Sequence, residues 1–503
     1  MKRNYRLLGL TLILFLVCQA AAAQTVSRTS YFMENATHRH LMNPALSPTR
    51  GYLSIPVLGE FSLGTESNWQ FTNLIYPAIE STNGQQRTFL HPTVSGAEFL
   101  QNINSDQYLR TDIRTSLLSY GRWIGRTGFL TFDVATRANL SLNLPKDFYV
   151  FAKMGMTNGS GTTYHFDNLM VNASVIAEGA LGYSLNLTDA IRVGVKGKFL
   201  AGGAMVKAGL KQMELNMSQD EWSVSSQGQL DVYGQSFAFK KNADGNVNGF
   251  VLPNPGLGGM GMAMDFGMEW APIQNIKFSV AVIDFGNIKW KKDNIKTATA
   301  TGSTSFSGLT YNPNDVGQQT INDQIESLKT TMMEMVGFKE QTVAEDYIQK
   351  LNPTINAGAE FALMSNRVSV GGLFSTKMLD NGERYSEYMA SLNLKPFHWF
   401  NLSGSYSFLN GQKETFGFAL GFVPGIINIF LACDYVPMKY GAINASQVFK
   451  VKKDFPVYFP LNALTTNIQL GISIPLSRRP VKDDLEEEDM EEVPVSDEIP
   501  PQY

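Results

Sequence analysis

One segment of this 503-residue chain alternates apolar and polar residues over an unusual length. From Phe129 to Pro145 the even-numbered positions are mostly apolar and the odd-numbered positions mostly polar. Successive side chains of a β-strand point to opposite faces, so this segment predicts one strand with an apolar and a polar surface. Strands in soluble proteins average about 5 to 6 residues, whereas about 9 to 11 tilted residues cross a bilayer. The length therefore indicates a membrane-spanning strand.

The first residues predict export. Three basic residues precede an apolar run at 7–17, and Ala-Ala-Ala follows at 21–23, which is the order of a secretory signal peptide cleaved after Ala23. Cys18 raises the alternative of a lipoprotein, which the bulky Val17 before it disfavours. Beyond residue 23 no stretch approaches the about 18 apolar residues of a transmembrane helix. An exported chain of long amphipathic strands is expected to form a closed barrel in the outer membrane of a Gram-negative bacterium.

Segments with a period of two, bounded by turn residues, predict an all-β antiparallel barrel of fourteen strands. The strands are expected near 51–66, 109–122, 128–144, 170–186, 190–203, 257–271, 276–291, 354–364, 367–378, 385–395, 400–409, 415–423, 427–437 and 464–476. Long and short connections alternate, and both chain ends fall on the short-turn side, as in bacterial barrels with an even strand number. The region 204–256 is either an outer hairpin above the membrane or two further strands, which would make sixteen.

A soluble β-sandwich is the alternative to a membrane barrel, because its strands alternate in the same manner. The positions of the tryptophans weigh against it. Five of them lie near predicted strand ends, where an amphipathic indole sits at a bilayer interface: Trp123, Trp222, Trp270, Trp290 and Trp399.

The barrel is expected to occupy residues 51–476 as one unit, although the length alone suggests about three domains. Beyond it, residues 477–503 hold three basic and ten acidic residues, while the whole chain has a net charge of −4. The acidic run at 483–492 and the prolines after it predict a disordered periplasmic tail. This tail is either a solvated extension or a docking site for a basic partner.

Nothing in the sequence predicts catalysis, and we expect no cofactor, no metal and no catalytic residue. The five histidines are scattered, and His38-x-His40 supplies two metal ligands at most. The glycines at 256–259 open a predicted strand rather than a helix, so they lack the geometry of a phosphate-binding loop. The net negative charge and the location argue against nucleic-acid binding.

Charged residues of both signs are expected on the lumen face. The alternation of side chains along the predicted strands places eight charged residues on this face: Asp133, Arg137, Glu178, Lys196, Lys198, Asp265, Glu269 and Glu360. Paired, they would stiffen the barrel and hold a plug; lining an open pore, they would select solutes. The strand at 276–291 also changes phase, because its apolar positions move from Val280 and Val282 to Ile283 and Phe285. We expect either a β-bulge at Ile283, Asp284, Phe285 and Gly286 or a strand that leaves the bilayer there.

The segment Met42-Asn43-Pro44-Ala45-Leu46-Ser47-Pro48 resembles the Asn-Pro-Ala motif of the FadL-type outer-membrane transporters and the PorV-like barrels. The strands at 261–267 and 279–290 and the segment 144–148 resemble an uncharacterised family of the same clan. The resemblance implies fourteen strands and a lumen plug at 24–50, with Asn43, Pro44 and Ala45 as its hinge. The alternative is that these prolines merely turn the chain into the first strand. FadL-type barrels release ligand sideways through a kink in their third strand, but the third strand here alternates without a break.

Apolar residues at the spacing of a helix occur only in the outer loops, at 321–336 and at 148–154. Such helices either cover the barrel mouth as an apolar entry site or pack on the rim. Two functions follow from the sequence and the resemblance. The first is passive transport of hydrophobic or amphipathic small molecules. The second is a PorV-like interaction barrel that presents its loops or tail to periplasmic or secretion-system proteins.

Overall fold

The computed structural model describes residues 26–478 with internal gaps. The gaps are 71–74, 77–86, 104, 156–160, 219–220, 244, 252–255, 307–336, 380–381, 383, 411–412, 437–439, 445–455 and 461–464. The expected signal peptide, the expected loop helix at 321–336 and nearly all of the expected tail lie outside the described residues.

Fourteen antiparallel strands close into a barrel, as the sequence predicted. The first strand is interrupted and consists of β1 (Arg50–Ser54) and β2 (Phe61–Ser67), which both pair with the last strand, β26 (Thr466–Arg478). The others, in order around the ring, are β5 (Gln107–Ile124), β6 (Gly128–Leu144), β8 (Leu169–Asn186), β9 (Ile191–Met217), β13 (Gly259–Ile273), β14 (Ile276–Trp290), β18 (Thr354–Leu363), β19 (Val368–Met378), β20 (Arg384–Phe397), β21 (Phe400–Leu409), β22 (Lys413–Phe422) and β23 (Asn428–Asp434).

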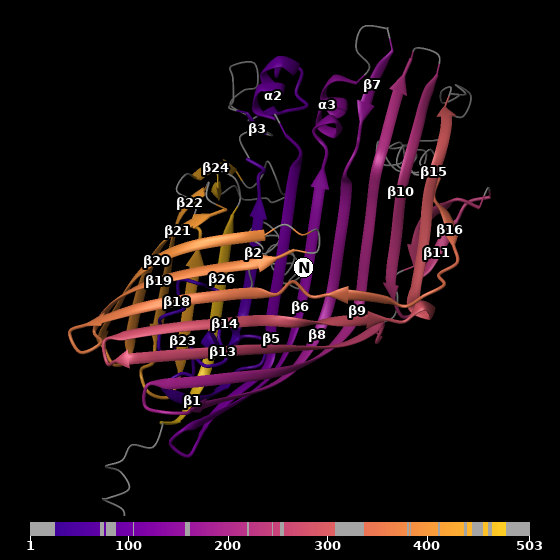
Figure 1. Ribbon diagram of the computed structural model, residues 1–503. Coiled ribbons are helices and arrows are strands. Elements are labelled where there is room, and N and C mark those ends of the chain that lie inside the picture. The colour runs from indigo at the N-terminus through magenta and orange to yellow at the C-terminus, as the bar shows by residue number, and fades with distance from the viewer. Residues whose placement is uncertain are drawn as a thin grey trace, which may run out of the picture.

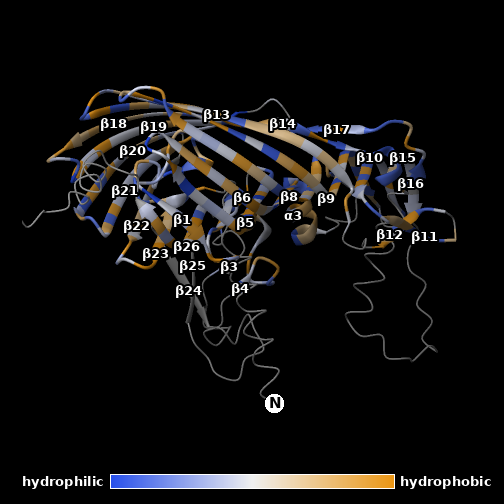
Figure 2. Ribbon diagram, turned by 90° about the horizontal axis from the view of Figure 1, so that it is seen from below, coloured by the Kyte–Doolittle hydropathy of each residue, from blue (hydrophilic) through white to orange (hydrophobic). Residues whose placement is uncertain are grey.

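The outer surface of the ring is apolar. On β13 the residues Met262 and Phe266 are 72% and 45% exposed, while the alternating Ala263 and Asp265 between them are buried. Figure 2 shows the same alternation as orange and blue bands along the strands. A closed barrel with an apolar exterior and a polar interior is the β-structure that can span a bilayer, because every backbone polar group is paired within the ring.

The region 204–256 does not add strands to the barrel. Beyond Gly203, β9 continues to Met217 and pairs with β10 (Trp222–Gly234), which pairs in turn with β15 (Ile295–Phe306). These strands, with β7 (Thr162–His165) and β16 (Lys339–Gln341), form a sheet that stands beyond the long-loop end of the ring (Figure 1). The outer-hairpin interpretation is therefore correct and the sixteen-strand alternative is wrong.

Two short helices lie at the same end of the molecule. One is α2 (Gly96–Asn102), which the sequence did not predict, and the other is α3 (Lys146–Met154), which covers the expected helix at 148–154. No helix in the described ranges is long and apolar enough to span a bilayer. The remaining short elements are β3 (Ile75–Tyr76), β4 (Arg87–Thr88), β11 (Ala238–Lys241), β12 (Val247–Val251), η4 (Lys292–Asn294), β17 (Tyr347–Lys350), β24 (Tyr440–Asn444) and β25 (Pro456–Pro460).

The interruption of the first strand leaves the wall closed. Residues 55–60 leave the ladder, with Val57 at a φ of 68°, and the facing strand β5 carries a bulge at Leu117. Backbone hydrogen bonds bridge the irregularity, from Val57 N–H to Ser116 at 2.9 Å and from Ile472 N–H to Leu58 at 2.9 Å. The third strand, β6, pairs with β8 from residue 128 to 143 without a register shift. It is therefore as regular as its sequence predicted.

The expectation about the tryptophans is wrong for three of the five. Trp290 and Trp123 are buried because they lie at inward-facing positions of β14 and β5. Trp222 lies in the outer sheet rather than in a barrel strand. Trp270 is exposed on the lipid side and Trp399 is half-buried in a short turn, which leaves these two at positions suited to an interface.

Candidate lumenal site

Residues 26–49, called here the N-terminal segment, lie inside the ring of strands. The segment contains one short 3-10 helix, η1 (Thr37–Leu41). It makes hydrogen bonds with β6, β13, β14, β18, β20 and β23, which stand on different sides of the barrel. Because the partners surround it, the N-terminal segment occupies the lumen.

The carboxylate of Asp434, at the end of β23, holds the beginning of the N-terminal segment. It accepts hydrogen bonds from Ser27 Oγ at 2.8 Å and from the backbone N–H groups of Arg28 at 3.0 Å and Thr29 at 3.2 Å. The Arg28 guanidinium lies 2.6 Å from the carboxylate of Glu387 on β20. All of these groups are buried, so removal of one charged partner would leave the other desolvated and unpaired.

A second ionic contact lies near the short turns. The Glu34 carboxylate is 2.9 Å from Lys277 of β14 and 3.0 Å from Lys395 of β20, and it accepts a hydrogen bond from Asn366 at 3.0 Å. Burial acts to raise the pKa of Glu34, but the two ammonium groups outweigh it and hold that pKa well below its ordinary value. Glu34 thus joins two strands that are far apart in the sequence.

Two histidines of the N-terminal segment are buried. His38 Nε2 lies 2.9 Å from Ser30 Oγ, and its ring packs on Phe430 with centroids 4.2 Å apart. Burial, with the nearby His40 and Arg39, lowers the pKa of His38 to about 3. Burial and Lys196 also lower the pKa of His40, against the opposing effect of Asp133. Both rings are therefore held in the lumen in the neutral form.

The predicted hinge residues make a close turn against the wall. Asn43 Oδ1 accepts a hydrogen bond from the backbone N–H of Ala45 at 2.9 Å, and Asn43 is fully buried. The turn lies on two glycines that face each other across β9 and β13, Gly194 and Gly267. A Cβ at Gly194 would lie 2.3 Å from the Pro44 carbonyl carbon, and one at Gly267 would lie 2.0 Å from Asn43 Oδ1. Only glycine leaves room for this turn.

The same fit recurs two and three strands further around the ring, on β18 and β19. Phe32 lies over Gly371 of β19, where an added Cβ would come within 2.4 Å of its ring, and Tyr31 lies within 2.9 Å of the Cβ position of Gly358. The Tyr31 hydroxyl is 3.0 Å from Ser279 Oγ. In the sequence these glycines look like ordinary strand residues, but in the structure they leave the space into which the N-terminal segment packs.

Beside the N-terminal segment, charged side chains from neighbouring strands line one side of the lumen. We call them the charged band: Glu60, Arg114, Asp133, Arg137, Glu178, Lys196, Lys198, Asp265 and Asp284. Asp133 links the band to the N-terminal segment, because it lies 2.8 Å from Lys196 Nζ and 3.2 Å from His40 Nε2. Lys196 is fully buried and Asp133 is 1% exposed.

The centre of the charged band is a chain of alternating charges. Arg137 contacts Glu178 and lies 2.7 Å from Asp284, and Lys198 bridges Asp284 at 2.6 Å and Asp265 at 2.7 Å. These residues come from β6, β8, β9, β13 and β14. Buried opposite charges paired in this way hold these neighbouring strands together on one side of the lumen.

The structure places Asp284 at a register shift between β13 and β14. Its φ is 60°, so it acts as one extra residue and its carboxylate reaches the lumen. The phase change in the sequence thus corresponds to the β-bulge alternative, and Ile283 is buried whereas Phe285 is 65% exposed. The extra residue puts these two side chains on opposite faces. Gly286 then faces the lumen again and lies against the Met262 carbonyl oxygen and Ala263 of β13.

Two other expected lumen residues lie nearer the short turns. Glu360 is buried and accepts a hydrogen bond from Ser369 at 2.6 Å, and Glu269 is half-buried opposite Arg192. Sequence reasoning missed Glu60 and Arg114. The alternation of β5 could have identified Arg114, but Glu60 ends the interruption at 55–60, where the period of two is lost.

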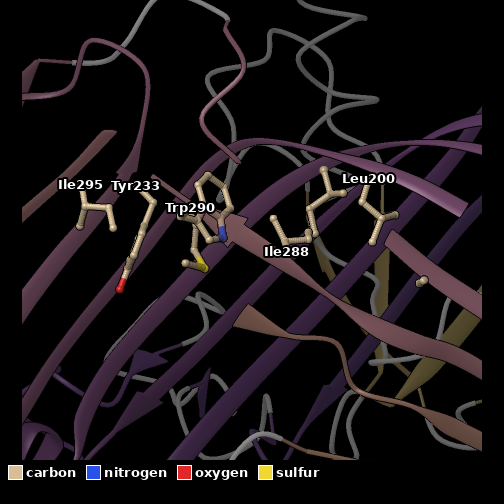
Figure 3. Close-up of a cluster of buried hydrophobic side chains, with 8 residues drawn as sticks. Leu200, Tyr233, Ile288, Trp290 and Ile295 are labelled. Carbon is tan, nitrogen blue, oxygen red and sulfur yellow. The ribbon is translucent and has the colours of Figure 1, made fainter. Parts of the chain in front are cut away.

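A band of inward-facing apolar side chains lies next to the charged band, on its long-loop side. We call it the apolar layer: Ile176, Leu200, Ala263, Ile288 and Trp290, which continue inward-facing positions of the same strands. Figure 3 shows Trp290, Ile288 and Leu200 in a row, with Tyr233 and Ile295 of the outer sheet beside them. The Trp290 ring fills the space left by three glycines, Gly202, Gly258 and Gly259, and its Nε1 donates to Gln349 at 3.0 Å.

Opposite walls also meet directly. Lys377 Nζ on β19 lies 3.4 Å from the Asp112 carboxylate on β5, although the two strands stand far apart around the ring. Two small hollows lie near the short turns and measure about 20 Å³ each. Each of them has room for about one water molecule. Among the described residues no group of three or more His, Cys, Asp or Glu is placed to hold a metal ion.

Comparison with known proteins gives a family and a set of distant folds. Residues 44–434 match the model of a family described as "Family of unknown function (DUF5723)". Among solved structures, the Ralstonia pickettii toluene transporter TbuX has 7% identity and a TM-score of 0.42, covering 90% of this chain and 99% of that one. A Pseudomonas aeruginosa FadL homologue has 7% identity and a TM-score of 0.37, covering 91% of this chain and 96% of that one. No curated protein matches the chain.

Proposed function

The chain belongs to the DUF5723 family of unknown function, and from its lumen we propose that it is a passive outer-membrane transporter for hydrophobic or amphipathic small molecules. The short turns and both chain ends face the periplasm of a Gram-negative cell in this proposal. Residues 24–50 act as a plug, with Asn43, Pro44 and Ala45 as its hinge. The barrel is not an enzyme.

The observation that carries the proposal is the order of the two bands inside the barrel. The apolar layer lies nearer the long loops, and the charged band lies next to it on the short-turn side. An amphipathic molecule that enters from outside would meet apolar side chains first and paired charges next. This order suits a molecule with an apolar body and a polar end, because each part finds a matching surface.

In this proposal the structure is the closed state. The apolar layer is sealed by Trp290, and the lumen is bridged by the pair Asp112–Lys377. Both contacts are reversible, since neither is covalent and each depends on a few side chains. Their separation would open a path past the N-terminal segment.

The experiment uses cells with an intact outer membrane and the fluorescent probe N-phenyl-1-naphthylamine, which intact lipopolysaccharide excludes. Trp290→Ala is expected to raise probe uptake several-fold, because it empties the glycine-lined space at the seal. Trp270→Ala is the matched control, since Trp270 faces lipid on the neighbouring strand. Hydrolysis of a polar β-lactam by a periplasmic enzyme reports leakage. Unchanged probe uptake, or an equal rise for both molecules, would contradict the proposal.

A PorV-like interaction barrel is the second candidate. It is favoured by the outer sheet of β9, β10 and β15, which extends far beyond the ring and which transport does not require. It predicts protein partners that co-purify after mild crosslinking. They should be lost when β10 and β15 or the tail at 477–503 are deleted.

A further inference from the structure

The charged band has one carboxylate more than it has cations. Five of its nine members are carboxylates and four are basic side chains. Four of the carboxylates lie within 3.2 Å of a basic nitrogen. The fifth, Glu60, has as its nearest one Arg114 Nε at 3.5 Å, and another nitrogen of that guanidinium lies 3.2 Å from Glu178. Glu60 is therefore the carboxylate without a cation of its own.

Hydrogen-bond donors do not compensate Glu60 either, as a comparison with Asp434 shows. Asp434 also lacks an ion-pair partner among the described residues, yet its carboxylate accepts five hydrogen bonds at 2.5–3.2 Å. Such a set of donors favours the ionised form of a carboxyl group. From the described residues, the side chain of Glu60 accepts one long hydrogen bond, from Gln469 Nε2 at 3.5 Å.

Two serine hydroxyls flank Glu60 without bonding to it. Ser116 on β5 donates its backbone N–H to the Glu60 carbonyl oxygen at 2.8 Å, and Ser62 follows Glu60 by two residues on the same face of the wall. Both serines are buried, and neither hydroxyl has a hydrogen-bond partner in the described part of the chain. The same holds for Nε and Nη2 of Arg114. An ionised carboxylate attracts such donors, so the missing bonds to Glu60 favour a neutral carboxyl group.

Solvent does not reach Glu60 from either side of the wall. The side chain is 5% exposed, and the residues before it, Val57 and Leu58, face the lipid. On the lumen side it lies beside Gln469, which is fully buried and accepts a hydrogen bond from the Ser27 N–H at 2.8 Å. A buried carboxylate that is neither paired nor hydrated loses its charge by binding a proton.

The charges around Glu60 cancel one another. The titratable groups that face it are Tyr52, Arg114, Asp133, Glu178 and Lys196. Asp133 lies 2.8 Å from Lys196, and Glu178 lies 3.2 Å from Arg114. No positive charge is therefore left over to hold Glu60 as an anion.

From this shortage of cations, donors and water, we propose that Glu60 is a proton-binding site in the wall of the barrel and keeps its proton at neutral pH. The proton leaves the Arg114 guanidinium to Glu178, across β6. Loss of the proton would turn that guanidinium toward Glu60 and weaken the contact between β5 and β8. The inference goes beyond transport and does not depend on it.

The test is infrared spectroscopy of the full mature chain in dodecyl maltoside at a pH of about 7.5, where exposed Asp and Glu are ionised. The carbonyl stretch of a protonated carboxyl group lies apart from the absorption of carboxylates and amides, and it shifts in D2O. The native chain is expected to show this signal, and Glu60→Gln should lose it. Glu178→Gln should lose it as well, because Arg114 is then free to pair with Glu60.

Conservative exchanges locate the proton. Glu60→Asp should move the signal to another frequency, whereas Asp265→Glu, at a buried carboxylate of the same charged band, should leave it in place. Asp434→Asn, at the carboxylate with five donors, should also leave it in place. Heat modifiability on gels checks that each variant folds, and the native spectrum needs no variant. A native chain without the signal, or a signal that moves in Asp265→Glu instead of Glu60→Asp, would overturn the proposal. Persistence of the signal in Glu178→Gln would overturn the role of Arg114.

Discussion

At the scale of single residues, glycines decide where the N-terminal segment can lie. Gly194 and Gly197 are on the same strand, yet a Cβ at Gly194 meets the Pro44 carbonyl carbon at 2.3 Å while one at Gly197 meets nothing within 4 Å. We predict that Gly194→Val displaces the Asn43-Pro44 turn and raises the rate of tryptic cleavage after Arg28 and Arg39 at least tenfold. The cause is steric, since valine itself suits a strand. Gly197→Val is the matched control and should leave that rate unchanged.

At the scale of elements, the N-terminal segment is a single body held by buried polar groups. His38 has a pKa of about 3 in the folded state, below its ordinary value, so the displaced segment binds a proton that the seated one does not. Acid should therefore favour displacement from about pH 6.5 downward, by up to about tenfold per pH unit for this histidine. Glu34 has a lowered pKa, so its contribution is complete above about pH 4.5 and is lost only below it.

Hydrogen exchange of residues 26–49 between pH 6.5 and 4.5, corrected for intrinsic rates, measures this effect. His38→Gln should flatten the dependence while keeping a group that can bond Ser30. If exchange in the native chain does not change over this range, the histidines are not buried in the way described.

At the scale of the whole molecule, one ion pair joins opposite walls of the barrel. Lys377 and Asp112 are 265 residues apart in the chain and 3.4 Å apart across the barrel. We predict that Asp112→Ala or Lys377→Ala raises single-channel conductance in planar bilayers, because one charge is removed from the bridge. The exchange Asp112→Lys/Lys377→Asp should restore the low conductance of the native chain. A double exchange as conductive as the single variants would show that the pair does not hold the walls together.

The sequence by itself determined the strands of the barrel and the face on which most of their residues lie. Both follow from a period of two, which is a local property of each segment. It could not settle the region 204–256, because a strand that continues above the membrane alternates like one inside it. It also misplaced Trp290 and Trp123, since position along a strand does not tell whether an indole points to lipid or to the lumen.

Only the tertiary structure decided which inward residues meet. Arg137 pairs with Asp284 and Asp133 with His40, and such partners are brought together by closure of the ring rather than by neighbouring sequence. The same holds for the glycines that seat Pro44 and Phe32, whose role depends on what lies opposite them. Local periodicity thus specifies a wall with two faces, and closure of that wall around the N-terminal segment makes the lumenal site.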